Sequence, residues 1–267
     1  MAVLTLSREH QNGCADIGRA VAEQLNYEFV DRGRLYASLE AAGEKWINLA
    51  KELDEEPPSL WEKYDREYLG FIALIESTIY EVALRNRAVI LGRGSAFLLH
   101  DVPQVLKVRI HAPMEVRIER RMTKKQEDHK TAETFIQKTD KSRHGYTQAL
   151  YGQKVTDFSK YDLIYNTGIQ TYDQVIRNLV EILKDWDRKE TPESHKKLEY
   201  QALAAKAKAL IFTHSEIFIP TLEIYSDGQA IIIKGVVHNP KENKLIQEII
   251  HQTVDPHPIR NELHYRQ

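Results

Sequence analysis

The sequence predicts an α/β fold, in which a parallel sheet carries helices on both faces, followed by a small α+β domain. Short apolar segments alternate with amphipathic helical ones up to about residue 188, which is the pattern of a parallel sheet covered on both sides. The run Ala88-Val89-Ile90-Leu91 contains no polar residue, as expected for a strand buried on both faces. After a charged stretch the pattern changes to the order α-β-β-α-β.

The composition indicates a globular protein of a reducing compartment. Of the 267 residues 42% are hydrophobic, and the net charge of −2 gives no reason to expect nucleic acid as a partner. No apolar run is long enough for a transmembrane helix, and the amino terminus lacks the pattern of a signal peptide. A single cysteine excludes an intramolecular disulfide framework. We therefore expect a cytoplasmic protein.

The chain opens with a strand, a polar loop, a helix and a second strand. In such a βαβ unit the loop amides and the amino terminus of the helix face an anion, usually a phosphate. A phosphate-binding loop of the pattern GxxxxGK[ST] supplies a lysine and a hydroxyl after its last glycine. Here Cys14 and Ala15 follow Gly13, so the loop alone also fits an ordinary turn between a strand and a helix.

The other elements follow from apolar runs and helical spacing. Strands are expected at residues 3–6, 27–30, 88–91, 105–111 and 162–167. Helices are expected at residues 36–49, 60–85, 113–122, 131–150 and 172–186. Ser59 and Glu62 have the spacing of a capping box for the long second helix of this list.

A charged stretch with one proline divides the chain. We predict a first domain over residues 1–188, a linker over residues 189–196 and a second domain over residues 197–267. In the second domain, Asp227-Gly228 between two apolar runs indicates a β-hairpin. The expected order of its elements is helix, two hairpin strands, helix and a final strand.

Five segments of the first domain carry a family resemblance through their order and spacing. They read LTLSREHQNGCADIGRAVAEQLNYEFVDRGRLY, VILGRGSAF, VRIHAPMEVRIERRM, DKSRHGY and YDLIYNTG. Together they resemble the cytidylate-kinase-like branch of the P-loop nucleoside monophosphate kinases. The resemblance implies a P-loop NTPase-like fold, ATP and Mg²⁺ as cofactors, and transfer of the γ-phosphate to CMP or a related monophosphate.

The resemblance also implies roles for individual residues. The residues that would contact ATP are Arg8, Asn12, Gly13, Cys14, Ala15 and Asp16. The residues that would contact the acceptor nucleotide are Asp31, Gly33, Tyr36, Arg93 and Asp140. The arginines that would act on the transferring phosphate are Arg117, Arg121 and Arg143. The resemblance assigns no residue to direct metal binding, and the histidines form no zinc-binding motif.

Several of these residues have a second interpretation. Asp31 could cap a turn or a helix, and Asp140 could form an ion pair with Arg143 at the i,i+3 spacing of a helix. Arg117 and Arg121, with Arg120 between them, could belong to a solvated basic helix face. Arg93 could be a surface arginine, although it follows a strand at the edge where open α/β sheets contact ligands.

The loop departs from the family pattern. Related sequences carry Gly-Ser-Gly-Gly-Arg where this chain has Gln11-Asn12-Gly13-Cys14-Ala15. Each lost charge-assisted phosphate contact is worth about 1.5–3 kcal/mol, and Arg8 or Arg19 would compensate only in part. A catalytically weak or inactive pseudokinase, which senses nucleotide or acts as a scaffold, is therefore the alternative. Cys14 could be a reactive thiol at a helix amino terminus or a small packing residue.

The second domain carries a separate resemblance. Its element order and the segment YSDGQAIIIKGVV resemble a BON domain. The resemblance implies a binding module whose partner is a protein or a membrane surface. A surface-binding protein with a purely structural kinase-like part is a third interpretation of the whole chain.

Overall fold

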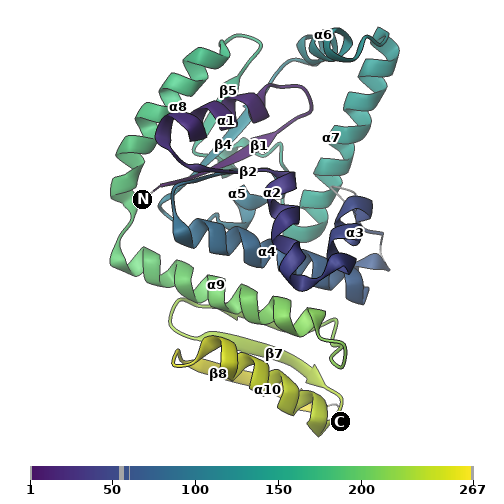
Figure 1. Ribbon diagram of the computed structural model, residues 1–267, viewed down its shortest axis with the longest axis vertical. Coiled ribbons are helices and arrows are strands. Elements are labelled where there is room, and N and C mark those ends of the chain that lie inside the picture. The colour runs from purple at the N-terminus through teal and green to yellow at the C-terminus, as the bar shows by residue number, and fades with distance from the viewer. Residues whose placement is uncertain (1, 54–56, 60, 266–267) are drawn as a thin grey trace. The chain divides into compact units, whose positions relative to one another are not determined.

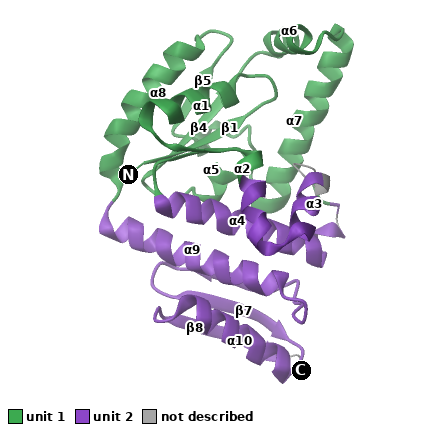
Figure 2. Ribbon diagram, viewed as in Figure 1, with its two compact units in different colours: residues 1–34, 53–58, 86–190 green, residues 35–52, 59–85, 191–267 purple. Residues whose placement is uncertain are grey.

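The structure is a computed structural model that describes residues 2–53, 57–59 and 61–265. The chain forms two compact units, which Figure 2 colours separately. Unit 1 comprises residues 1–34, 53–58 and 86–190, and unit 2 comprises residues 35–52, 59–85 and 191–267. The division is therefore not linear along the chain, because a segment from the first 90 residues groups with the carboxyl-terminal part.

Unit 1 contains a five-stranded parallel sheet with the strand order β2-β3-β1-β4-β5. Figure 1 labels β1, β2, β4 and β5 of this sheet. The strands are β1 (Val3–Arg8), β2 (Glu28–Val30), β3 (Ala88–Leu91), β4 (Val105–His111) and β5 (Leu163–Asn166). All five lie where the sequence predicts them. Because β1 is central, the loop that follows it lies at the sheet edge where parallel α/β folds bind ligands.

Helices cover both faces of this sheet, which confirms the predicted α/β class. Helices α1 (Cys14–Leu25) and α8 (Tyr172–Trp186) pack on one face against Leu4 and Leu6 of β1. Ser7 points to the opposite face, because side chains alternate along a strand. Near that face lie the short helix α5 (Ser95–Leu98) and the long helix α7 (His129–Tyr151), and α6 (Met114–Lys125) packs against α7.

Unit 2 contains a three-stranded sheet with the order β6-β7-β8. Strands β6 (Glu223–Ser226) and β7 (Ile231–Val237) are antiparallel, whereas β8 (Ile259–Tyr265) is parallel to β7. With α9 (Pro192–Thr213) and α10 (Pro240–Val254) these strands give the predicted α-β-β-α-β order. None of the described helices is long and apolar enough to cross a membrane.

Helix α4 (Arg66–Arg85) shares its core with the carboxyl-terminal elements of unit 2. Lys208 of α9 forms an ion pair with Glu76 of α4 at 2.9 Å. Arg66 donates to the Ser215 carbonyl at 2.6 Å. Gly70 of α4 lies so close to Trp46 of α3 (Glu44–Leu53) that an added Cβ would be 2.4 Å from the indole ring. The carboxyl-terminal elements therefore do not pack as an independent domain.

Two helix predictions are wrong in their boundaries. The helix expected at residues 36–49 is divided into α2 (Arg32–Ala37), the 3-10 turn Ser38–Ala42 and α3, because Gly43 adopts a φ of 112°. The helix expected at residues 60–85 begins at Arg66, where the Asp65 carboxylate accepts from two first-turn amides. The Ser59–Glu62 capping box exists, but it precedes only a short 3-10 turn; residue 60 lies outside the described residues.

The predicted linker is also largely helical. Helix α9 begins at Pro192, and Thr191 and Ser194 form its capping box. A threonine cap followed by proline at the first helical position is a helix-start signal. In the sequence this signal is embedded in charged residues, which explains why the stretch resembles a linker.

Candidate functional site

The loop between β1 and α1 borders an open pocket of about 550 Å³, which we call the loop pocket. Its lining runs without interruption from Arg8 to Asp16 and adds Lys124 of α6 and Arg143 of α7. All six residues predicted to contact ATP therefore line one pocket. Gly13 adopts a φ of 80° immediately before α1, so the amino terminus of this helix opens toward the pocket.

Asn12 gives the loop its shape from within. Its side chain is buried, with Nδ2 donating to the Ile110 carbonyl at 2.5 Å and Oδ1 accepting from the Cys14 amide at 3.1 Å. The Thr167 hydroxyl donates to the Asn12 carbonyl at 2.8 Å. In a phosphate-binding loop the backbone amides cradle the ligand. Here one of those amides is occupied by the side chain of Asn12.

Arg117 is buried beneath the loop between carboxylates. Its Nη1 donates to Asp140 at 2.5 Å and to the His10 carbonyl at 3.3 Å. Its Nε lies 3.7 Å from a carboxylate oxygen of Glu9. Asp140 also accepts from the His10 amide at 2.8 Å. The sequence predicts that Arg117 acts on the transferring phosphate and that Asp140 contacts the acceptor. The structure brings the two together as a pair that supports the loop.

The other two arginines of α6 are engaged in the same way. Arg120 donates to the Thr167 carbonyl at 2.6 Å and reaches the Gln11 carbonyl at 3.5 Å. Arg121 donates to Glu127 at 3.1 Å and is only 7% exposed. Burial of Arg117 and Arg121 contradicts the interpretation of these two residues as a solvated basic face.

Two side chains of the loop are held neutral. His10 packs against Phe135 with ring centroids 5.1 Å apart. Burial, and then the nearby charges of Arg143 and Arg121, lower the pKa of His10 to about 4. Burial raises the pKa of Cys14 to about 12. Because the thiolate is the reactive form, Cys14 behaves as a packing residue and not as a reactive thiol.

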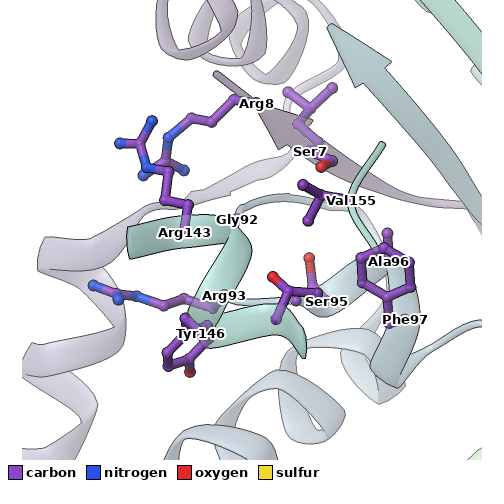
Figure 3. Close-up of a pocket in the computed structure, with 13 residues that line it drawn as sticks. Ser7, Arg8, Gly92, Arg93, Ser95, Ala96, Phe97, Arg143, Tyr146 and Val155 are labelled. Carbon is purple, nitrogen blue, oxygen red and sulfur yellow. The ribbon is translucent and has the colours of Figure 1, made fainter. Parts of the chain in front are cut away.

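A second pocket of about 420 Å³ lies where β1 and β3 end, beside α5 and α7 (Figure 3). We call it the β1–β3 pocket. Its charged side chains are Arg8, Arg93 and Arg143, and no carboxylate is among the described residues that line it. The remaining lining residues are Leu6, Ser7, Gly92, Gly94, Ser95, Ala96, Phe97, Tyr146, Thr147 and Val155.

Arg93 is positioned by a strained backbone. Gly92, Arg93 and Gly94 have φ values of 78°, 57° and 68°, so three consecutive residues are left-handed. Glycine accepts this conformation readily, whereas it costs other residues about 1–2 kcal/mol. Arg93 is buried, with 3% of its surface exposed, and it lines the β1–β3 pocket. Strain of this kind is concentrated at functional sites.

Arg8 and Arg143 line both pockets. Arg8 is the last residue of β1, and Arg143 projects from α7 toward it (Figure 3). Groups bound in the two pockets would therefore meet beside the same two guanidinium groups. Arg19, the other candidate for a compensating cation, lies instead over the Phe29 ring at 5.3 Å.

The residues predicted between β2 and α4 have other placements. Asp31 accepts from the Arg34 amide at 3.0 Å and so caps α2. Capping is the alternative role that the sequence predicts for Asp31. Gly33 is an exposed residue of α2. Tyr36 belongs to unit 2, where its ring lies edge-on to Phe71 with centroids 6.4 Å apart.

The sequence did not single out four polar residues of the pocket linings. Ser7, Ser95 and Thr147 line the β1–β3 pocket, and Lys124 lines the loop pocket. Two features of the sequence could have identified three of them. Ser7 precedes Arg8 at the end of a strand, and Ser95 follows Gly94. Lys124 follows Arg120 by four residues and so lies on the same face of the helix.

The residues of the loop pocket provide few ligands for a metal ion. Ala15 stands where a P-loop carries the hydroxyl that binds Mg²⁺. Asp16, in the first turn of α1, is a carboxylate of the lining. Within the described ranges, no three His, Cys, Asp or Glu side chains are grouped so that they could hold a metal ion.

Comparison with known proteins identifies relatives of the amino-terminal part of the chain. The model of the cytidylate kinase-like family matches residues 3–169. Cytidylate kinase of Methanopyrus kandleri is 27% identical over 182 residues, which cover 64% of this chain and 88% of that protein. Uronate isomerase of Corynebacterium glutamicum is 33% identical over 99 residues; the match covers 37% of this chain and only 19% of that protein.

Solved structures support the same fold. An uncharacterized protein from Eubacterium ventriosum has a TM-score of 0.54 at 20% identity, with 69% of this chain and 99% of that chain covered. At this level of identity the likeness shows a shared fold and nothing about activity.

Proposed function

The chain belongs to the cytidylate kinase-like family, and from that premise we propose that it transfers the γ-phosphate of ATP to a nucleoside monophosphate. At family level the relationship indicates a kinase of nucleotides or small molecules. CMP is the first candidate acceptor, because the relative from Methanopyrus kandleri is named a cytidylate kinase.

One observation carries the proposal, namely that Arg8 and Arg143 line both pockets. A donor in the loop pocket and an acceptor in the β1–β3 pocket would place their reacting phosphates between these two cations. Arg93, which also lines the β1–β3 pocket, is suited to bind the phosphate of the acceptor, because guanidinium groups bind phosphate in a bidentate manner.

The proposed reaction needs little covalent chemistry from the protein. An oxygen of the acceptor phosphate attacks the γ-phosphorus of ATP, and the bond between that phosphorus and the β–γ bridging oxygen breaks. ADP leaves with the electron pair of the broken bond. Catalysis of such a transfer consists mostly of positioning and of stabilising negative charge. Arg8 and Arg143 would supply that stabilisation.

The loop pocket fits the phosphates of ATP through its cations and the amino terminus of α1. Mg²⁺, when bound, neutralises charge on the phosphates, and Asp16 is the loop residue suited to hold it, directly or through water. Ala15 offers no hydroxyl, so phosphate oxygens and water would supply the remaining ligands.

The experiment is a coupled assay with ATP and each nucleoside monophosphate, combined with calorimetric binding of ATP and CMP. ADP formation that depends on one monophosphate would support the proposal and identify the acceptor. ATP binding without turnover would refute catalysis and favour the second candidate below. Absence of both binding and turnover would refute both candidates.

The second candidate is a pseudokinase that binds nucleotide and signals through its carboxyl-terminal elements. Its support is the occupied Cys14 amide, together with the absence of a cation at positions 14 and 15 of the loop. These features weaken the contacts that would hold the triphosphate. The acceptor side does not discriminate between the candidates, because Arg93 would bind a monophosphate in either.

We further propose that α9 to β8 act as a BON-like binding module for a protein or a membrane surface. The α-β-β-α-β order and the β6–β7 hairpin support it. Because α4 shares the core of these elements, the test uses the full chain in flotation with anionic and neutral vesicles. Flotation with vesicles would support a membrane partner, and its absence would exclude the membrane as partner.

A further inference from the structure

We propose that Lys124 of α6 supplies the phosphate-binding cation that the loop itself lacks. The inference rests on the proposed function, because it concerns how the loop pocket holds the phosphates of ATP. Lys124 lines that pocket, although it belongs to a helix more than 100 residues after the loop.

The first step is the lack of a cation at positions 14 and 15, where the loop joins α1. Cys14 is buried and neutral, and Ala15 has no polar group. The two carboxylates of the lining, Glu9 and Asp16, would repel a polyphosphate. Glu9 is partly neutralised by Arg109, at 3.0 Å. The pocket therefore depends on cations that reach it from other elements.

The second step is that the arginines of α6 are used elsewhere. Arg117 and Arg121 are buried and paired with Asp140 and Glu127, and Arg120 binds the Thr167 carbonyl. Releasing Arg117 or Arg121 toward a ligand would leave a partly buried carboxylate unpaired, which is costly. These arginines fix the loop, so they are poor candidates for direct phosphate contact.

The third step is the different environment of Lys124. It follows Arg120 by one helical turn, so it lies on the loop side of α6. It is exposed, and within the part of the chain that the structure describes it has no ion-pair or hydrogen-bond partner. A lysine ammonium is a mobile point charge with three donors. Lys124 can therefore turn to a phosphate without breaking an existing contact.

The neighbouring Lys125 provides a matched control. It has the same charge, lies on the same helix and is exposed, but it does not line the loop pocket. Replacing either lysine by methionine keeps the aliphatic stem and removes one positive charge. Any effect of overall charge or of helix stability should be shared by the two variants.

The test is calorimetric binding of ATP, ADP and adenosine to the wild-type chain, Lys124→Met and Lys125→Met. Lys124→Met is expected to weaken ATP binding about tenfold, the loss of one charge-assisted contact, and to leave adenosine binding unchanged. Lys125→Met should match the wild type. In turnover the KM for ATP should rise, while the KM for the acceptor stays constant.

The outcomes separate this inference from the proposed function. If the wild type binds ATP and Lys124→Met binds it equally well, the role of Lys124 is refuted and the proposed function stands. If both methionine variants weaken ATP equally, the effect is one of general charge, and the inference is refuted. If the wild type binds no ATP, the proposed function fails and the inference fails with it.

A second variant tests whether Lys124 replaces a loop cation. Ala15→Arg restores the arginine that related sequences carry at this position of the loop. In that background Lys124→Met is expected to weaken ATP binding only about threefold, because the two cations would share one role. An undiminished tenfold loss would show that Lys124 acts independently of the missing cation, contrary to the proposal.

Discussion

The two pockets of unit 1 share Arg8 and Arg143 but differ in what their other arginines do. In the β1–β3 pocket, Arg93 lines the wall and is held there by a strained backbone. Beside the loop pocket, the arginines of α6 bind carboxylates and loop carbonyls. The arginine of the first pocket lines the space that a ligand would occupy, whereas the arginines beside the second hold the shape of the loop.

The difference shows that a cluster of arginines near a phosphate-binding loop can have two uses that compete. A guanidinium that is buried against a carboxylate fixes the backbone around it, but it can no longer be moved to a ligand at low cost. Compared with the Gly-Ser-Gly-Gly-Arg pattern of related sequences, the loop of this chain has Gln11 in place of a glycine and Asn12 in place of the serine. Its shape then depends on contacts from β4, α6 and the segment after β5.

The largest effect is expected for Arg143→Ala, because Arg143 is common to both pockets. Its removal should lower kcat/KM about 10³-fold, in line with the loss of a cation that stabilises a transferring phosphoryl group. Lys141→Ala, an exposed residue of the same helix, is the control. Steady-state kinetics of both variants is the measurement. A loss confined to one substrate would show that the two pockets do not meet at Arg143.

A large effect on stability, but not on chemistry, is expected for Arg117→Met. It leaves Asp140 without its ion-pair partner, whereas Glu9 keeps Arg109, and breaking such a buried pair costs about 3–5 kcal/mol. The free energy of unfolding from urea titration is the measurement. Arg117→Met combined with Asp140→Asn should cost less than Arg117→Met alone, because the buried carboxylate is gone. A double variant that is less stable than the single one would contradict this explanation.

Much of the fold could be predicted from the sequence because the signals are local. The five strands of unit 1 are apolar runs, and α8 has a clear apolar face. The sequence did not predict helix boundaries that are set by a capping side chain or by a glycine inside an apolar helical pattern. Asp65 caps α4, which begins at Arg66, six residues after the expected start at 60, and Gly43 divides the preceding helix. The grouping of α4 with α9 depends on contacts between distant residues, which periodicity does not reveal.

The same limit applies to the candidate site. Residues that follow strand ends, such as Arg8 and Arg93, could be placed at the ligand edge because parallel sheets expose that edge. The engagement of Arg117 could not be predicted, since its partner Asp140 lies 23 residues away on another helix. Lys124 was missed because a lysine in a basic helix has no local signal that distinguishes it from Lys125.

A smaller and more selective effect is expected for Arg93. Arg93→Ala should weaken acceptor binding about tenfold and leave ATP binding unchanged, because Arg93 lines the β1–β3 pocket and not the loop pocket. Arg93→Gly removes the same side chain and also relieves the left-handed backbone. It should therefore be about 1 kcal/mol more stable than Arg93→Ala. Calorimetry with CMP and urea titration measure the two effects, and equal CMP affinity in all three proteins would refute the assignment.

The smallest effect concerns the pH dependence that His10 gives to the loop. Its pKa is lowered to about 4 by burial and by Arg143 and Arg121, so the unfolded chain takes up this proton at a higher pH than the folded one. The contribution of His10 to stability is complete above about pH 6.5 and is lost as the pH falls toward 4. Unfolding of the wild type and of His10→Gln at several pH values between 7 and 4 should show a difference that shrinks with acid. Parallel curves would mean that the pKa of His10 does not change on unfolding, which would contradict the shift caused by its burial.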